Sequence, residues 1–253
     1  MKTISVILSV LASALLLGTT LPGCKEQVEL TELEQFVERT LDLEGTALED
    51  TLRGYIAAGS PQAKYAEFLL GNHFHTMASD TAAAMGWNAA FVSDLLDSAE
   101  INFAAAVARD STFIEAIVNL GSVWDDRSEQ RASNAERQKR INEAERFYRL
   151  ALDVDPTDEK ARCNLGGLYL RQRRTQEALD EVQTALEHNP QSALAHYNLA
   201  IMFAEQKIYR EAMREWELAA KHDPDGDIGA RSRENVRIVK DLMNAPEPQG
   251  HQH

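Results

Sequence analysis

The sequence lacks the motifs that mark most enzymes and the charge that marks most nucleic-acid-binding proteins. It contains no glycine-rich phosphate loop, no nucleophile elbow and no metalloprotease helix motif. We therefore predict no catalytic residue, no enzymatic activity and no cofactor. Lysine and arginine total 26 residues against 40 acidic residues. The resulting net charge of −14 argues against nucleic acid as a partner and against broad adhesion to anionic membranes.

Long apolar runs are also scarce, and the one at the N-terminus has the character of a targeting segment. Residues 4–17 are uncharged and apolar but too few to span a membrane comfortably. The following residues 21–24, Leu-Pro-Gly-Cys, resemble the processing box of bacterial lipoproteins. This resemblance implies that a signal peptide, residues 1–23, is removed and that Cys24 carries the lipid, palmitate among its acyl chains. An ordinary secretory signal followed by a chance cysteine is the alternative.

The residue after Cys24 bears on the destination of such a lipoprotein. Lys25 resembles the sorting pattern for the outer membrane in enteric-type bacteria. We therefore expect a membrane lipoprotein of the cell envelope that faces the periplasm, at the outer membrane rather than the inner.

Cysteine is scarce, with two residues in the chain. If Cys24 is lipidated, Cys163 stands alone and no intramolecular disulfide can form in the mature protein. No histidine or aspartate at a fixed spacing suggests that Cys163 is activated, so we expect a buried, inert thiol.

The second half of the chain repeats itself at a spacing of 34 residues. The matching pairs are Leu165 with Leu199, Gly166 with Ala200, Tyr169 with Phe203, Ala178 with Ala212, Val182 with Trp216, Ala185 with Ala219, and Pro190 with Pro224. In each copy the apolar residues recur at three- and four-residue steps, which predicts two amphipathic helices closed by a proline. The small residues let the two helix backbones approach closely. This pattern resembles the tetratricopeptide repeat.

Two weaker copies precede the regular ones. In the copy that begins with Leu120-Gly121, Ala144 lies 23 positions after Gly121, whereas Ala178 of the regular copy lies 12 positions after Gly166. Leu70-Gly71 is followed by Ala99 after 28 residues. The insert after Gly121 lacks proline and glycine, so we expect lengthened helices rather than a flexible loop there.

The resemblance implies an all-α fold, a right-handed superhelix of helical hairpins with two regular units, two enlarged units and a C-terminal capping helix. The plainest interpretation of the acidic segment after Cys24 is that it is a solvated spacer. The predicted segments are a signal peptide at 1–23, an acidic N-terminal helical arm at 24–60, a degenerate enlarged unit at 61–113, an enlarged unit at 114–158, regular repeats at 159–192 and 193–226, a capping helix at 227–243 and a disordered tail at 244–253.

Three asparagines recur at one helical phase, each directly before a Leu-Gly or Leu-Ala pair: Asn119, Asn164 and Asn198. The resemblance implies that this position faces an inner groove, where an amide can bond an extended peptide backbone. We expect Tyr197, Ile201 and Leu194 to share or flank that groove. The alternative is that each asparagine simply bonds a neighbouring helix.

Two other clusters have a functional and a plainer interpretation. Arg127, Arg131, Arg137 and Arg140 form either a basic surface for an acidic partner or a helix laced with Arg–Glu pairs. His73, His75 and Met77 contain metal-binding side chains, but residues two apart on a helix point to different faces. We therefore predict no metal site.

These observations favour a membrane-anchored adaptor that binds a protein or peptide partner and helps to assemble an envelope complex. A structural stabiliser that binds through its convex face or its inserted helices is the alternative. A metal-binding protein or an enzyme ranks third.

Overall fold

The computed structural model describes residues 31–244, so the predicted lipidation site Cys24 and the segment 245–253 lie outside the described residues. The described residues form eleven helices and no strand, which confirms the all-α fold. Every helix in this range is too short or too polar to cross a membrane. The chain divides into two compact units, with Val154 ending the first and Asp155 beginning the second.

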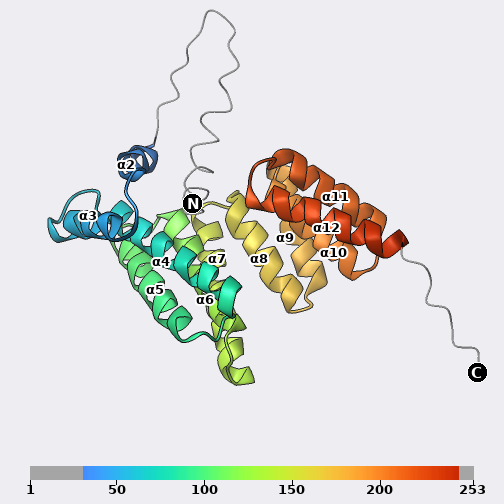
Figure 1. Ribbon diagram of the computed structural model, residues 1–253, viewed down its shortest axis with the longest axis horizontal. Helices are drawn as coiled ribbons and strands as arrows, with labels where there is room; N and C mark the ends of the chain where they lie inside the picture. The colour runs from blue at the N-terminus through green and yellow to red at the C-terminus, as the bar shows by residue number, and fades with distance from the viewer. Residues whose placement is uncertain (1–30, 245–253) are drawn as a thin grey trace, which may run out of the picture. The chain divides into compact units, whose positions relative to one another are not determined.

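The first unit is built from long paired helices (Figure 1). Helix α4 packs on α5, and α6 packs on α7. The helices are α2 (Glu32–Thr40), α3 (Gly45–Ala57), α4 (Ala63–Met85), α5 (Ala90–Arg109), α6 (Ile114–Glu129) and α7 (Asn134–Val154). Helices α4 to α7 have 16 to 23 residues each, whereas α8 to α11 of the second unit have 13 or 14. The inserted residues therefore lengthen the helices.

Glycine marks the crossing of each long pair. Gly71 on α4 lies against the ring of Phe103 on α5, and Gly121 on α6 lies against the ring of Tyr148 on α7. Both rings are buried. The glycine lets the partner ring touch the helix backbone directly, so the pairs close at a short distance.

The acidic N-terminal segment differs from a solvated spacer. Phe36 of α2 and Leu52 of α3 are completely buried in the core of the first unit. Phe36 meets the ring of Tyr55 edge-on, with the ring centroids 5.1 Å apart. Thr31 caps α2 reciprocally with Glu34, which fixes where the helix begins. The glutamates occupy the outer side of helices whose apolar stripe is part of the core.

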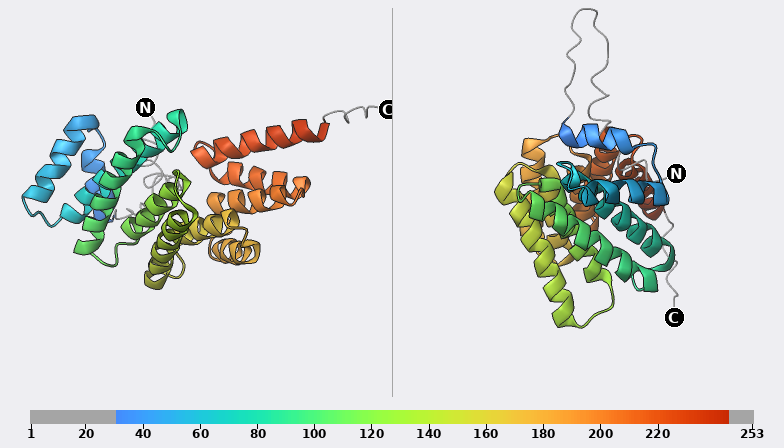
Figure 2. Two further views of the ribbon diagram at one scale, coloured as in Figure 1. Left: turned by 90° about the horizontal axis from the view of Figure 1, so that it is seen from below. Right: turned by 90° about the vertical axis from the view of Figure 1, so that its left-hand side faces the viewer.

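The second unit contains the regular repeats and the last helix. It comprises α8 (Glu159–Arg171), α9 (Thr175–His188), α10 (Ala193–Glu205), α11 (Tyr209–His222) and α12 (Asp227–Asn244). Asp158 and Ser192, 34 positions apart, each accept a hydrogen bond from a backbone N–H in the first turn of α8 and α10. Helix α12 lies alongside α11, as the red helix in Figures 1 and 2 shows.

The turns inside both regular repeats share one backbone conformation. Arg173 and Lys207 have φ values of 62°, in the left-handed region. The two residues at each turn donate backbone hydrogen bonds to carbonyls of the last helical turn, from Arg173 and Arg174 after α8 and from Lys207 and Ile208 after α10. This Schellman arrangement ends the first helix and turns the chain into the second. Because glycine is the residue that adopts this conformation without strain, the two basic residues store a small strain here.

Candidate protein-binding surface

The asparagines of the predicted groove link neighbouring helices. On α10, Asn198 donates from Nδ2 to the backbone oxygen of Cys163 on α8, at 2.8 Å. On α6, Asn119 donates from Nδ2 to Oδ1 of Asn72 on α4, at 2.7 Å. Asn119 is only 7% exposed. The helix-bonding role that the sequence left open is therefore present at both positions.

Asn198 and Asn119 nevertheless differ in what remains accessible. Asn119 is buried, whereas Asn164 and Asn198 are each half-buried. A primary amide has two N–H groups and an acceptor oxygen, and the bond to Cys163 uses one of these N–H groups of Asn198. The other N–H and Oδ1 of Asn198 can still take part in binding.

A glycine opens the surface beside Asn198. Gly167 lies on α8, one turn after Asn164, and is half-buried. A Cβ placed on Gly167 would lie 3.9 Å from Nδ2 of Asn198 and 3.7 Å from Nη1 of Arg171. These are ordinary contact distances, so a methyl group would fit above this backbone without displacing either neighbour. We call Asn164, Gly167, Arg171 and Asn198 the glycine seat.

Helix α12 covers part of the apolar side of the predicted groove. Tyr197 and Ile201 are half-buried and pack against a cluster that includes Val236 and Val239 of α12. The guanidinium carbon of Arg231 lies 5.2 Å from the centre of the Tyr197 ring. Leu194, at the start of α10, is half-buried. The last helix therefore contacts Tyr197 through Arg231 and shares a hydrophobic cluster with Ile201.

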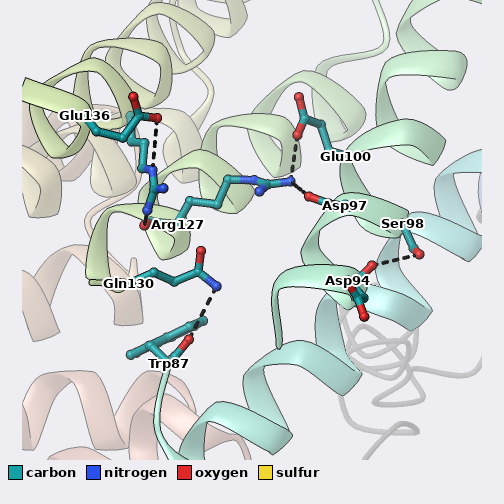
Figure 3. A network of polar contacts seen from close by, with 9 residues as sticks. Trp87, Asp94, Asp97, Ser98, Glu100, Arg127, Gln130 and Glu136 are labelled. Carbon is teal, nitrogen blue, oxygen red and sulfur yellow. Dashed lines mark hydrogen bonds and ion pairs between the residues drawn. The ribbon is translucent and has the colours of Figure 1, made fainter. Parts of the chain in front are cut away.

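Two of the four arginines proposed as a basic surface are held by internal bonds (Figure 3). Arg127 has an exposed side-chain fraction of 13% and pairs with Asp97 and with Glu100, the latter at 2.8 Å. Arg140 donates from Nη1 to the backbone oxygen of Arg127, at 2.7 Å, and also contacts Glu136. These two side chains stabilise the α5–α6–α7 packing.

The other two arginines, Arg131 and Arg137, are exposed. Arg137 lies 3.7 Å from Glu129. Only this part of the predicted basic surface is therefore available to a partner.

The histidines of the His-x-His segment point to different helices. Nε2 of His75 lies 2.8 Å from Asp126 on α6, and Nε2 of His73 lies 3.5 Å from Glu49 on α3. No group of three or more potential metal ligands occurs within residues 31–244. Cys163 is completely buried, and burial raises the pKa of its thiol to about 12. Such a thiol is protonated and inert at neutral pH.

Comparisons with known proteins agree with this architecture. Residues 163–227 match the tetratricopeptide repeat family. Among solved structures, TTC0263, described as a thermophilic tetratricopeptide repeat protein in Thermus thermophilus, is similar to this chain with a TM-score of 0.54 and 15% identity, over 76% of this chain and 98% of that one. MamA gives a TM-score of 0.47 and 15% identity, over 78% and 97% of the two chains. No curated protein matches the sequence.

The chain therefore carries tetratricopeptide repeats within residues 163–227, and its described residues have the all-helical fold of the solved tetratricopeptide repeat structure. The likeness to TTC0263 concerns the fold alone at this level of identity. A fold of this class suggests a protein that binds other proteins or peptides through the surfaces of its stacked hairpins.

Proposed function

We propose that this chain is a non-enzymatic adaptor, anchored by lipid at Cys24 to the outer membrane of a bacterium and facing the periplasm. There it binds an extended segment of a partner protein and supports the assembly of an envelope complex. The lipoprotein-like residues 21–24 and Lys25 support the anchor. The repeat fold supports the adaptor role.

The glycine seat is the observation that carries the binding proposal. The absent side chain at Gly167 exposes backbone on α8, so a partner's chain can approach closely there. Half-buried Asn198 offers a donor and an acceptor to that partner's peptide groups, at a smaller desolvation cost than a charged side chain.

The test fills the seat without disturbing the core. The full chain is expressed in its own bacterium, crosslinked, extracted with detergent and co-purified, and its partners are identified by mass spectrometry. The Gly167→Leu protein should no longer co-purify with the partner, because the leucine side chain would cover the backbone at position 167. Gln183→Leu is the matched control, since Gln183 is exposed on α9, the second helix of the same repeat.

A folded Gly167→Leu protein that retains its partner in full would refute the seat as the binding site. Arg131→Glu with Arg137→Glu then tests the competing site on the inserted α6–α7 hairpin. That alternative is favoured by the exposure of both guanidinium groups.

The anchor is tested separately. Cys24→Ser should abolish labelling by a radioactive fatty acid, whereas Cys163→Ser should keep it because Cys163 is buried. Acylation that persists in Cys24→Ser would remove the basis for membrane anchoring and leave the seat proposal intact.

A further inference from the structure

The turn between α4 and α5 carries exposed apolar side chains and no charge. Residues 81–93 contain no acidic or basic residue, although charged residues make up 26% of the chain. Met85 is 72% exposed and Phe91 is 70% exposed, one on each side of the turn. Three alanines around them, Ala83, Ala84 and Ala90, are also exposed. We call residues 81–93 the apolar turn.

The apolar turn is held in place by the neighbouring hairpin. Gly86 adopts a φ of 87°, which ends α4 and reverses the chain. Gln130, at the end of α6, donates from Nε2 to the backbone oxygen of Trp87, at 3.4 Å (Figure 3). The backbone N–H of Arg131 donates to Oδ1 of Asn88, at 2.6 Å. Met85 and Phe91 are therefore exposed on an anchored turn.

One basic residue is bonded to this turn. Arg131 is exposed, and its side chain forms no ion pair with a residue in the range 31–244. The backbone of Arg131 is bonded to Asn88 within the apolar turn itself. Exposed Asp80 and Asp94 border the turn in the sequence, so any attraction of the turn to a bilayer comes chiefly from its exposed apolar side chains, as in a peripheral membrane contact.

We propose that the apolar turn inserts into the interfacial region of a lipid bilayer. Met85 and Phe91 enter the boundary between headgroups and acyl chains, and Arg131 meets a lipid phosphate. Trp87, inside the turn, is half-buried and packs against the core of the first unit, which holds the turn in place. The net charge of −14 opposes adhesion of the remaining surface, so the contact is confined to this turn.

A bilayer fits these features better than a protein partner does. Met85 is the last residue of α4, Phe91 is near the start of α5, and both side chains are more than two-thirds exposed. A protein would need a deep apolar socket to cover both, whereas a fluid interface accommodates them without a preformed shape. The contact does not depend on Cys24, although a lipid anchor would place the turn near a bilayer.

The test measures which residues enter the membrane. A single thiol is introduced at Ala90 in the apolar turn or at Ala104, also exposed on α5 and about 21 Å further along the helix. Each thiol is labelled with the fluorophore nitrobenzoxadiazole in the full chain carrying Cys24→Ser, where buried Cys163 does not react. The proteins are mixed with vesicles of phosphatidylcholine, with or without phosphatidylglycerol.

We expect the fluorophore at position 90 to shift to the blue, to lose quenching by aqueous iodide and to be quenched by brominated acyl chains. The fluorophore at position 104 should remain open to iodide. Adding Met85→Ser with Phe91→Ser should abolish the signal at position 90, whereas Ile101→Ser should keep it, since Ile101 is 69% exposed but outside the turn. Arg131→Glu should weaken the signal with phosphatidylglycerol present.

Equal iodide quenching at positions 90 and 104 in vesicles would overturn the proposal. Protection of position 90 in native membranes but not in pure lipid vesicles would also overturn it, and would assign the turn to a protein. Both outcomes are separate from the tests of Cys24 and of the glycine seat.

Discussion

Alanine substitution at two glycines within helices, Gly121 and Gly167, should change the free energy of unfolding in opposite directions. A Cβ on Gly121 would lie 2.5 and 2.7 Å from two ring carbons of Tyr148, closer than real Cβ atoms approach. The ring cannot move away easily, because Tyr148 is 1% exposed. A Cβ on Gly167 meets nothing closer than 3.7 Å. Gly121→Ala therefore creates a clash, whereas Gly167→Ala does not.

The magnitudes follow from two opposing effects. Replacing glycine by alanine within a helix raises the free energy of unfolding by about 0.5–1 kcal/mol, because the unfolded chain loses conformational freedom. Overpacking a core costs about 1–3 kcal/mol. At Gly167 only the first effect acts, so we expect a gain of about 0.5–1 kcal/mol. At Gly121 the clash exceeds the gain, so we expect a net loss of about 1–2 kcal/mol.

Urea unfolding followed by circular dichroism measures both changes. Gly71→Ala is the control for Gly121→Ala, because its Cβ would lie 2.6 Å from the ring of Phe103 and should also destabilise. A neutral or stabilising Gly121→Ala would mean that α6 and α7 do not cross at this glycine. A destabilising Gly167→Ala would mean that the space above Gly167 is filled, and the glycine seat would lose its basis.

Three further predictions concern backbone strain, pH and thiol reactivity. Arg173→Gly and Lys207→Gly should each raise the free energy of unfolding by about 0.5–1 kcal/mol in denaturant titrations, because both residues have positive φ values. Alanine at the same two sites should give no such gain. Lys64 and Thr112 lower the pKa of the Asp110 carboxyl from 3.8 to about 2, so its stabilisation is present above pH 3.8 and lost as the pH falls through 2. Asp110→Asn should thus cost less than about 1 kcal/mol at neutral pH, and its difference from the wild type should vanish near pH 2 in acid titrations. Cys163 should not react with Ellman's reagent until the protein unfolds, and labelling of the native protein at that residue would contradict its burial.

The repeats could be predicted from sequence because their key contacts are local in the chain. Ala178 and Ala212 are completely buried, as small residues at a helix crossing should be. A Cβ on Gly166 would lie 2.9 Å from Val182, only 16 positions later in the chain. Residue size and spacing alone determine such a hairpin, so its pattern is readable without knowledge of distant residues.

The role of α2 and α3 could not be predicted in the same way, because it depends on a surface far along the chain. Phe36 packs with Tyr65, their ring centroids 6.1 Å apart, and Tyr65 also donates to Glu32 at 3.0 Å. The high density of glutamate favours a solvated helix, and nothing local shows that α4 presents an apolar face to cover. Thr31 and Glu34 form a capping-box pattern that indicates the start of a helix, but the pattern says nothing of what the helix packs against.

The asparagines show where periodicity stops being informative about function. One helical phase places Asn119 and Asn198 toward the preceding first helix, and that phase serves helix bonding and peptide binding equally well. What separates the two roles is the neighbour, since Asn119 is buried against Asn72 while Asn198 lies beside Gly167. Alanine at Asn198 would remove a helix–helix hydrogen bond worth about 0.5–1.5 kcal/mol together with any contact to a partner, so it cannot distinguish the roles. Leucine at Gly167 tests the binding role more directly, because it adds a side chain at the surface and removes no hydrogen-bonding group.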